Sequence, residues 1–283
     1  MTASLIITLR ETLEAALIIG ITLGYLKKTN QTSYNKIIYA AVAAGIIASL
    51  FGAILFSQIA GGFSGKNEAL FEGVVMLIGA GLITTVILWM IKQHERIEKF
   101  KDKLANHIEK GQALELFFLI FFAVLREGIE TVIFLYAAST VATNSILGGL
   151  IGILLAIILA YLLFKQSIKL PLKKFFNFTS IILILFAAGL TAHGIHELQE
   201  AGVIPIVVGQ VWDINPQIIT EGIYPILHEK GAIGGFAKGL FGYNGNPSLI
   251  EVISYLLYLA SIALLWKHLK KRYNTENEKI ITP

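Results

Sequence analysis

Seven long apolar stretches, separated by polar or charged segments, dominate this sequence of 283 residues. A helix needs about 20 predominantly apolar residues to cross a bilayer, and each stretch is long enough to span one. Because backbone polar groups in lipid must be satisfied internally, we expect an all-α integral membrane protein with seven transmembrane helices. The predicted spans cover approximately residues 2–26, 36–57, 69–91, 113–140, 146–164, 176–200 and 249–266.

The composition agrees with a membrane protein and excludes several other classes. Hydrophobic residues make up 55% of the chain and charged residues only 15%, whereas soluble domains carry roughly 25% charged residues. This excludes a soluble enzyme, a nucleic-acid-binding protein and a disordered chain. The absence of cysteine excludes disulfides and thiolate metal sites. We expect residues 1–283 to form a single transmembrane domain whose surroundings are membrane lipid.

Basic residues predict the orientation of the spans. Eighteen of the 23 Lys and Arg residues fall in alternate connections and in the C-terminal tail, at 27–36, 92–110, 165–174 and 267–279. The opposite side holds only Lys66, Lys230 and Lys238. Since Lys and Arg concentrate on the cytoplasmic side, we expect the N-terminus outside and the C-terminus in the cytoplasm, with the protein in the cytoplasmic (inner) membrane. The long segment 201–247 then lies outside, either as a loop packed over helix ends or as a cap over an entrance.

A short charged motif occurs twice and indicates an internal repeat. The sequence LRETLE at residues 9–14 recurs as LREGIE at 125–130. The repeat unit is three helices, about 1–91 and about 113–200, followed by the C-terminal helix at about 249–266. Three is an odd number, so the second copy must have the opposite orientation in the membrane. This 3+3 inverted repeat is a common plan of secondary transporters, which bind ions near the midplane.

The repeated motif predicts a central metal site. Glutamates three residues apart project from one face of a helix, and both motifs fall near the middle of the bilayer, where ionisable residues are costly and usually functional. Four carboxylates with two arginines suit a di- or trivalent cation with hard oxygen ligands. The alternative is a pair of Arg–Glu clamps that only hold helices together. The candidate metal ligands are Glu11, Glu14, Glu127 and Glu130, with Arg10 and Arg126 in support.

A second group of polar residues is expected at the outer ends of helices. His193, His196, Glu197 and Glu200 follow helical spacing and form one stripe. Glu68 and Glu72 lie four residues apart at the start of the third span, and Glu251 lies at the start of the seventh. Imidazole and carboxylate groups together favour a vestibule that attracts metal, although a solvated helix end would have the same composition.

The two Arg-Glu-x-x-Glu motifs in a seven-helix chain resemble those of the oxidase-dependent iron permease family, which includes the fungal high-affinity and bacterial Efe-type iron permeases. The segment AHGIHELQEAG at residues 192–202 is also similar to the bacterial branch. The resemblance covers essentially the whole chain. It implies import of iron as substrate (Fe3+ or Fe2+), taken as Fe(III) after oxidation by a partner, with the four motif glutamates handling iron and no permanent cofactor.

The resemblance also implies partners on separate chains, namely an extracytoplasmic ferroxidase, a cupredoxin-like protein or a haem peroxidase. Two other functions stay open. A membrane-embedded di-metal carboxylate enzyme would usually need Glu-x-x-His motifs on its helices, and neither repeated motif has a histidine. A Ca or Mn cation exchanger would use the same oxygen ligands. We expect a transporter that is not an enzyme.

Overall fold

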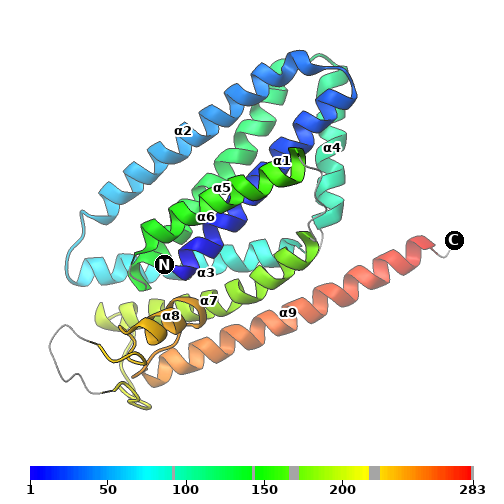
Figure 1. Cartoon of the computed structure of the whole chain (residues 1–283). Coiled ribbons are helices and arrows are strands. Elements are labelled where there is room, and N and C mark those ends of the chain that lie inside the picture. Colours follow the sequence, from blue (N-terminus) through cyan, green and yellow to red (C-terminus); the bar gives the residue numbers. More distant parts are fainter. Residues whose placement is uncertain (91–92, 142–143, 166–171, 217–223, 282–283) are drawn as a thin grey trace. The chain divides into compact units, whose positions relative to one another are not determined.

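The structure is a computed structural model that describes residues 1–90, 93–141, 144–165, 172–216 and 224–281 (Figure 1). All regular secondary structure within these ranges is helical, which agrees with the predicted all-α class. The elements are α1 (Thr2–Lys28), η1 (Thr32–Tyr34), α2 (Asn35–Ala60), α3 (Lys66–Met90), α4 (Gln93–Glu109), α5 (Ala113–Val141), α6 (Ser145–Lys165), α7 (Leu172–Glu200), α8 (Ala232–Phe241) and α9 (Leu249–Ile281).

Several of these helices have the length and composition of membrane spans. Five segments of the described chain are long and apolar enough to cross a membrane, in α2, α3, α6, α7 and α9. Helices α1 and α5 are also long enough, at 27 and 29 residues, but each carries one charged motif in its apolar sequence. The count of seven spans therefore stays a prediction.

The described helices divide into two compact units. The first unit contains α1, α2, α4, most of α5, and α6. In it α6 runs alongside α1 in the same direction (Figure 1). Gly152 of α6 lies against Leu5 and Thr8, while Phe164 at the end of α6 lies against Gly20. Small residues allow such close approach of helix backbones in membranes.

A second helix pair in the first unit repeats this arrangement. Gly45 of α2 lies against Val124 of α5, and Ser49 lies against Gly128 one turn further along both helices. Helices α2 and α5 therefore also run in the same direction. Each pair therefore joins a helix that carries one motif to the helix that follows the other motif-bearing helix: α1 packs with α6, which follows α5, and α5 packs with α2, which follows α1.

Helix α4 is a difference from the sequence analysis, which treats the charged run 92–110 as a connection. The structure folds Gln93–Glu109 into a helix. Its Leu104 and Ile108 are almost fully buried in a cluster with Leu26 of α1, Ile38 of α2 and Leu116 of α5. An apolar stripe with charges on the opposite face stabilises such a helix by packing. The helix therefore covers one end of the first unit.

The second unit contains α3, most of α7, α8 and α9. Helices α3 and α7 run in opposite directions and cross at two glycines. Gly73 lies against the carbonyl oxygen of Gly194, and Gly194 lies against Met76 and Leu77. This crossing brings the N-terminus of α3 to the C-terminus of α7, where predicted outer residues occur.

The remaining differences concern the outer segment and the helix ends. Helix α8 forms within the segment 201–247, and α9 continues to Ile281, past the predicted end near residue 266. Two basic residues used for the orientation, Lys92 and Lys169, lie outside the described residues, as do residues 217–223. The first two helices of each predicted repeat belong mainly to the first unit, namely α1 and α2, and α5 and α6. The third helix of each predicted repeat, α3 or α7, belongs mainly to the second unit.

Candidate metal site

The first motif lies in the first half of α1 and the second at the midpoint of α5. Glu11 is about 13 Å from the start of α1, because each helical residue rises 1.5 Å. Glu127 is equally far from both ends of the 29-residue α5. In a membrane span of this length such positions would lie deep in the hydrocarbon, where a carboxylate is costly.

The two helices bring three carboxylates together. One oxygen each of Glu11, Glu14 and Glu127 lies within 4.8 Å of the other two. We call these residues the central carboxylate cluster. Glu11 and Glu127 are almost completely buried, with 1% and 2% of their surface exposed. Distances of this size allow the three oxygens to bind one cation between them.

The arginines pair with the glutamates of their own helix. Arg10, which is 1% exposed, contacts Glu11 at 2.7 Å through Nη1 and Glu14 at 2.6 Å through Nη2. Arg126 contacts Glu127, and its Nε lies 3.6 Å from Glu130. Each guanidinium thus bridges the two glutamates of one motif. The i,i+4 pairs follow directly from the helical spacing of the motif.

The arginines do not use all the carboxylate oxygens. Oε1 of Glu11 accepts the hydrogen bond from Arg10, whereas Oε2 is buried without a hydrogen-bond partner among the described residues. Glu127 has the same arrangement, with Oε1 on Arg126 and Oε2 buried without such a partner in the described part of the chain. A buried polar atom in this state is energetically costly. A cation bound to these oxygens would remove that cost.

Glu130 is the fourth predicted ligand and is not one of the three glutamates whose oxygens meet within 4.8 Å. Its side chain is 14% exposed and pairs with Arg126. The structure therefore brings together three of the four motif glutamates and leaves the fourth beside the arginine of α5.

A second acidic site lies in the second unit, where α3 begins and α7 ends. A cavity of about 280 Å³ is lined by Glu68 and Glu72 of α3 and by Glu197 and Glu200 of α7. We call it the α3–α7 acidic pocket. Lys66 also lines it and supplies one positive charge. Four carboxylates from two helices can attract a cation to this position.

The two histidines of the predicted stripe have different surroundings. Nε2 of His196 lies 3.3 Å from Glu200, next to the acidic pocket. His193 is 93% buried, and its Nδ1 lies 3.2 Å from the carbonyl oxygen of Gly189 in the same helix. Nε2 of His196 can therefore bind a cation together with the carboxylates of the pocket, whereas Nδ1 of His193 faces a carbonyl group of its own helix.

The structure adds Asn244, to which the sequence analysis gives no role, and it gives Glu251 specific partners. Glu251, at the start of α9, is 2% exposed and lies 3.0 Å from Nδ1 of His196. Asn244 donates to its other oxygen at 2.7 Å. The sequence does predict the contact between Ser248 and Glu251, because these residues have the spacing of a capping box.

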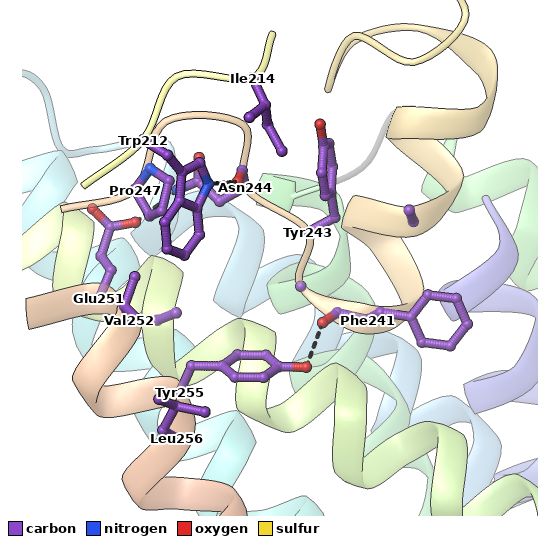
Figure 2. Close-up of a pocket in the computed structure, with 13 residues that line it drawn as sticks. Trp212, Ile214, Phe241, Tyr243, Asn244, Pro247, Glu251, Val252, Tyr255 and Leu256 are labelled. Carbon is purple, nitrogen blue, oxygen red and sulfur yellow. Dashed lines mark hydrogen bonds between the residues drawn. The ribbon is translucent and has the colours of Figure 1, made fainter. Parts of the chain in front are cut away.

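Glu251 also forms part of the wall of a larger cavity of about 470 Å³, shown in Figure 2. Apolar and aromatic residues such as Trp212, Tyr255 and Leu256 make up most of its lining. The hydroxyl group of Tyr255 donates to the carbonyl oxygen of Phe241 at 2.8 Å, and Trp212 donates to the carbonyl oxygen of Asn244 at 3.3 Å. The first bond attaches the outer segment to α9, and the second joins two parts of the outer segment.

Comparison with known proteins gives a consistent family relationship. Residues 1–273 match the family described as the iron permease FTR1 family. The ferrous iron permease EfeU of Yersinia pestis is 31% identical over 266 residues, which cover 92% of this chain and 91% of the relative. EfeU of Escherichia coli O6:K15:H31 is 32% identical over 259 residues, covering 90% and 91%. No solved structure matches the chain.

Proposed function

Because this chain belongs to the iron permease FTR1 family, we propose that it imports iron across the cytoplasmic membrane through the central carboxylate cluster. The observation that carries this proposal is the convergence of Glu11, Glu14 and Glu127 from two helices. Carboxylate oxygens are hard ligands that suit iron ions, and intramembrane ionisable residues commonly mark an ion pathway. Family membership supports transport rather than catalysis.

The charge balance favours a cation pathway over a structural clamp. The two motifs supply four glutamates and two arginines, so ionised groups leave a net charge of about −2 for a cation to balance. A clamp would need only the pairs Arg10–Glu14 and Arg126–Glu130. The buried Oε2 atoms of Glu11 and Glu127 remain available beyond those pairs. We propose that Glu130 joins the cluster as the fourth ligand when iron passes.

The packing of the first unit supports an inverted repeat. Exchange of the two halves would relate α1 to α5 and α2 to α6, and it would therefore convert the α1–α6 pair into the α5–α2 pair. Both pairs run in the same direction and meet at small residues, at Gly152 in one and Gly45 in the other. We propose seven spans with the N-terminus outside and the C-terminus in the cytoplasm, since this orientation follows the positive-inside rule.

We propose that iron arrives as Fe(II) and enters the cluster as Fe(III). The relatives are named ferrous iron permeases, which supports Fe(II) as the form supplied to the system. Hard carboxylate ligands favour the smaller, more highly charged ferric ion. A separate extracytoplasmic partner, either a cupredoxin-like ferroxidase or a haem peroxidase, would remove the electron. The α3–α7 acidic pocket would collect iron before it reaches the central cluster.

The test is iron uptake into proteoliposomes that contain purified protein, with one glutamate changed at a time. Glu11→Gln and Glu127→Gln each keep side-chain volume but remove an anionic ligand, so uptake should fall at least about tenfold, equivalent to about 1.4 kcal/mol. Glu115→Gln, at an exposed position on the same helix as Glu127, is the matched control and should transport normally. Uptake is compared for Fe(III) citrate and for Fe(II) held reduced by ascorbate, with excess Mn2+ or Ca2+ as competitors.

Each outcome of this test has a defined meaning. Normal uptake in stable Glu11→Gln and Glu127→Gln proteins would refute the cluster as the ion pathway. Uptake of Fe(II) alone would refute Fe(III) as the transported form. Equal inhibition by Ca2+ or Mn2+ would indicate a general cation exchanger. Loss of thermostability with normal uptake per folded protein would indicate a structural clamp.

A further inference from the structure

We infer that Glu251 is a positioning residue. It holds the His196 ring so that Nε2 is presented to a cation in the α3–α7 acidic pocket. This inference rests on the proposed role of the pocket in collecting iron. All the residues concerned lie in the second unit. His196 and Glu251 belong to α7 and α9, and the contact joins residues 55 positions apart in the sequence.

The surroundings of Glu251 determine which nitrogen of His196 carries a proton. The backbone N–H of Ser248 donates to Oε1 at 3.1 Å, and the side-chain amide of Asn244 donates to Oε2 at 2.7 Å. Glu251 thus accepts hydrogen bonds at both oxygens, as an ionised carboxylate does. Its partner in His196, Nδ1 at 3.0 Å, is then the N–H donor.

In a neutral imidazole, a proton on Nδ1 leaves Nε2 with the lone pair that a metal ligand needs. Nε2 lies 3.3 Å from Oε1 of Glu200, which lines the acidic pocket. A cation held by Glu200 could therefore also bind the Nε2 lone pair. Histidines that bind metals usually donate their second nitrogen to a carboxylate or carbonyl, which fixes the ring and raises its basicity. Glu251 has this relation to His196.

Burial makes Glu251 suitable for this role. Its side chain is 2% exposed, whereas the side chains of His196 and Glu200 are 44% and 61% exposed. The fixed partner is therefore inside, and the two groups that face a cation are accessible. Asn244, which belongs to the outer segment, further restrains Glu251 by its hydrogen bond at the cavity shown in Figure 2. Gly242, with φ +69°, lies against Gly189 of α7 and brings this segment to the helix.

A purely structural role for Glu251 must be distinguished. Ser248 and Glu251 form a capping box at the start of α9, because Ser248 Oγ also accepts from the Glu251 N–H at 3.4 Å. Glutamine is equally suited to this position of a capping box. Glu251→Gln therefore keeps the cap and removes the negative charge that orients His196. Ser248→Ala weakens the cap and leaves the contact between Glu251 and His196 in place.

The experiment measures Co2+ binding to the purified full-length protein by visible absorption. The part of the absorption change that is lost in His196→Ala defines binding that involves this imidazole. We expect Glu251→Gln to weaken that binding by about 10- to 100-fold, the range for loss of such an outer partner. Ser248→Ala should lower the unfolding temperature and change Co2+ affinity by less than about twofold, since the histidine contact remains.

The outcomes separate this inference from the proposed function. Co2+ absorption that His196→Ala leaves unchanged would overturn both the role of the pocket and the positioning of His196. Absorption that is lost in His196→Ala but has wild-type affinity in Glu251→Gln would overturn the positioning role alone. Equal loss of affinity in Glu251→Gln and Ser248→Ala would also overturn it, in favour of a structural cap. Iron import through the central cluster is decided separately, by uptake in Glu11→Gln and Glu127→Gln proteins.

Discussion

The hydroxyl group of Thr8 on α1 lies 2.9 Å from the carbonyl oxygen of Gly149 on α6 and shares its proton between that oxygen and the carbonyl oxygen of Ser4. This contact lies within one turn of Arg10 and Glu11, and the side chain of Thr8 is fully buried. Helix α6 can approach α1 this closely because Gly148, Gly149 and Gly152 have no side chains. The contact therefore holds the part of α1 that carries the first motif against a neighbouring helix.

Gly152→Ala should destabilise the first unit. A Cβ atom at this position would meet Thr8 Oγ1 and the backbone oxygen of Leu5, so α1 and α6 would have to separate. Overpacking of this kind costs about 1–3 kcal/mol. The measurement is the unfolding temperature of the purified protein in detergent, with Gly24→Ala on α1 as control because nothing lies within 4 Å of that position. Equal stability of the two variants would contradict the proposed packing role.

Arg10→Lys should impair iron uptake more than Arg126→Lys. Arg10 is 1% exposed and contacts Glu11 and Glu14 through two different nitrogens, a fork that a single ammonium group cannot reproduce. Arg126 is 37% exposed and its contact with Glu130 is longer, at 3.6 Å.

The expected stability loss for Arg10→Lys is about 1.5–3 kcal/mol, the value of one hydrogen bond to a charged group. Uptake and unfolding temperature should be measured on the same preparations of both variants. A larger effect of Arg126→Lys on both quantities would show that the arginine of α5 is the principal partner of the cluster.

The α3–α7 acidic pocket should matter most when iron is scarce. Glu72→Gln with Glu197→Gln removes two of its four carboxylates and lowers the local concentration of cations. We expect uptake to fall about tenfold at limiting iron and to approach the wild-type rate at saturating iron, because the central cluster is unchanged. The measurement is the dependence of the initial uptake rate on iron concentration. A uniform decrease at all concentrations would favour a structural role.

Cysteine labelling tests the orientation, because the chain has no natural cysteine. A cysteine at Lys101, which is exposed on α4, should react with a membrane-impermeant maleimide only after the cell is opened. A cysteine at Lys230, in the segment between α7 and α9, should react in intact cells. Labelling in the reverse order would overturn the predicted orientation.

The sequence alone was sufficient for the helical class and for the position of the charged motifs. Apolar stretches of membrane length and the i,i+3 and i,i+4 spacings are local properties, so the long helices and the Arg10–Glu14 pair follow from them. The sequence analysis missed helix α4, because charged residues dominate the segment. Its buried residues, Leu104 and Ile108, stabilise a helix only when they pack against α1, α2 and α5.

The tertiary structure decided which of these residues come together. The repeated motif gives no reason to distinguish Glu127 from Glu130. Among the described residues, packing brings the Glu127 carboxylate within 4.8 Å of Glu11 and Glu14, whereas Glu130 pairs with Arg126. The contact between His196 and Glu251 crosses 55 positions and depends on how the segment before α9 lies on α7. Such distances depend on packing between segments far apart in the sequence, such as Gly242 against Gly189. The local periodicity of the sequence does not determine them.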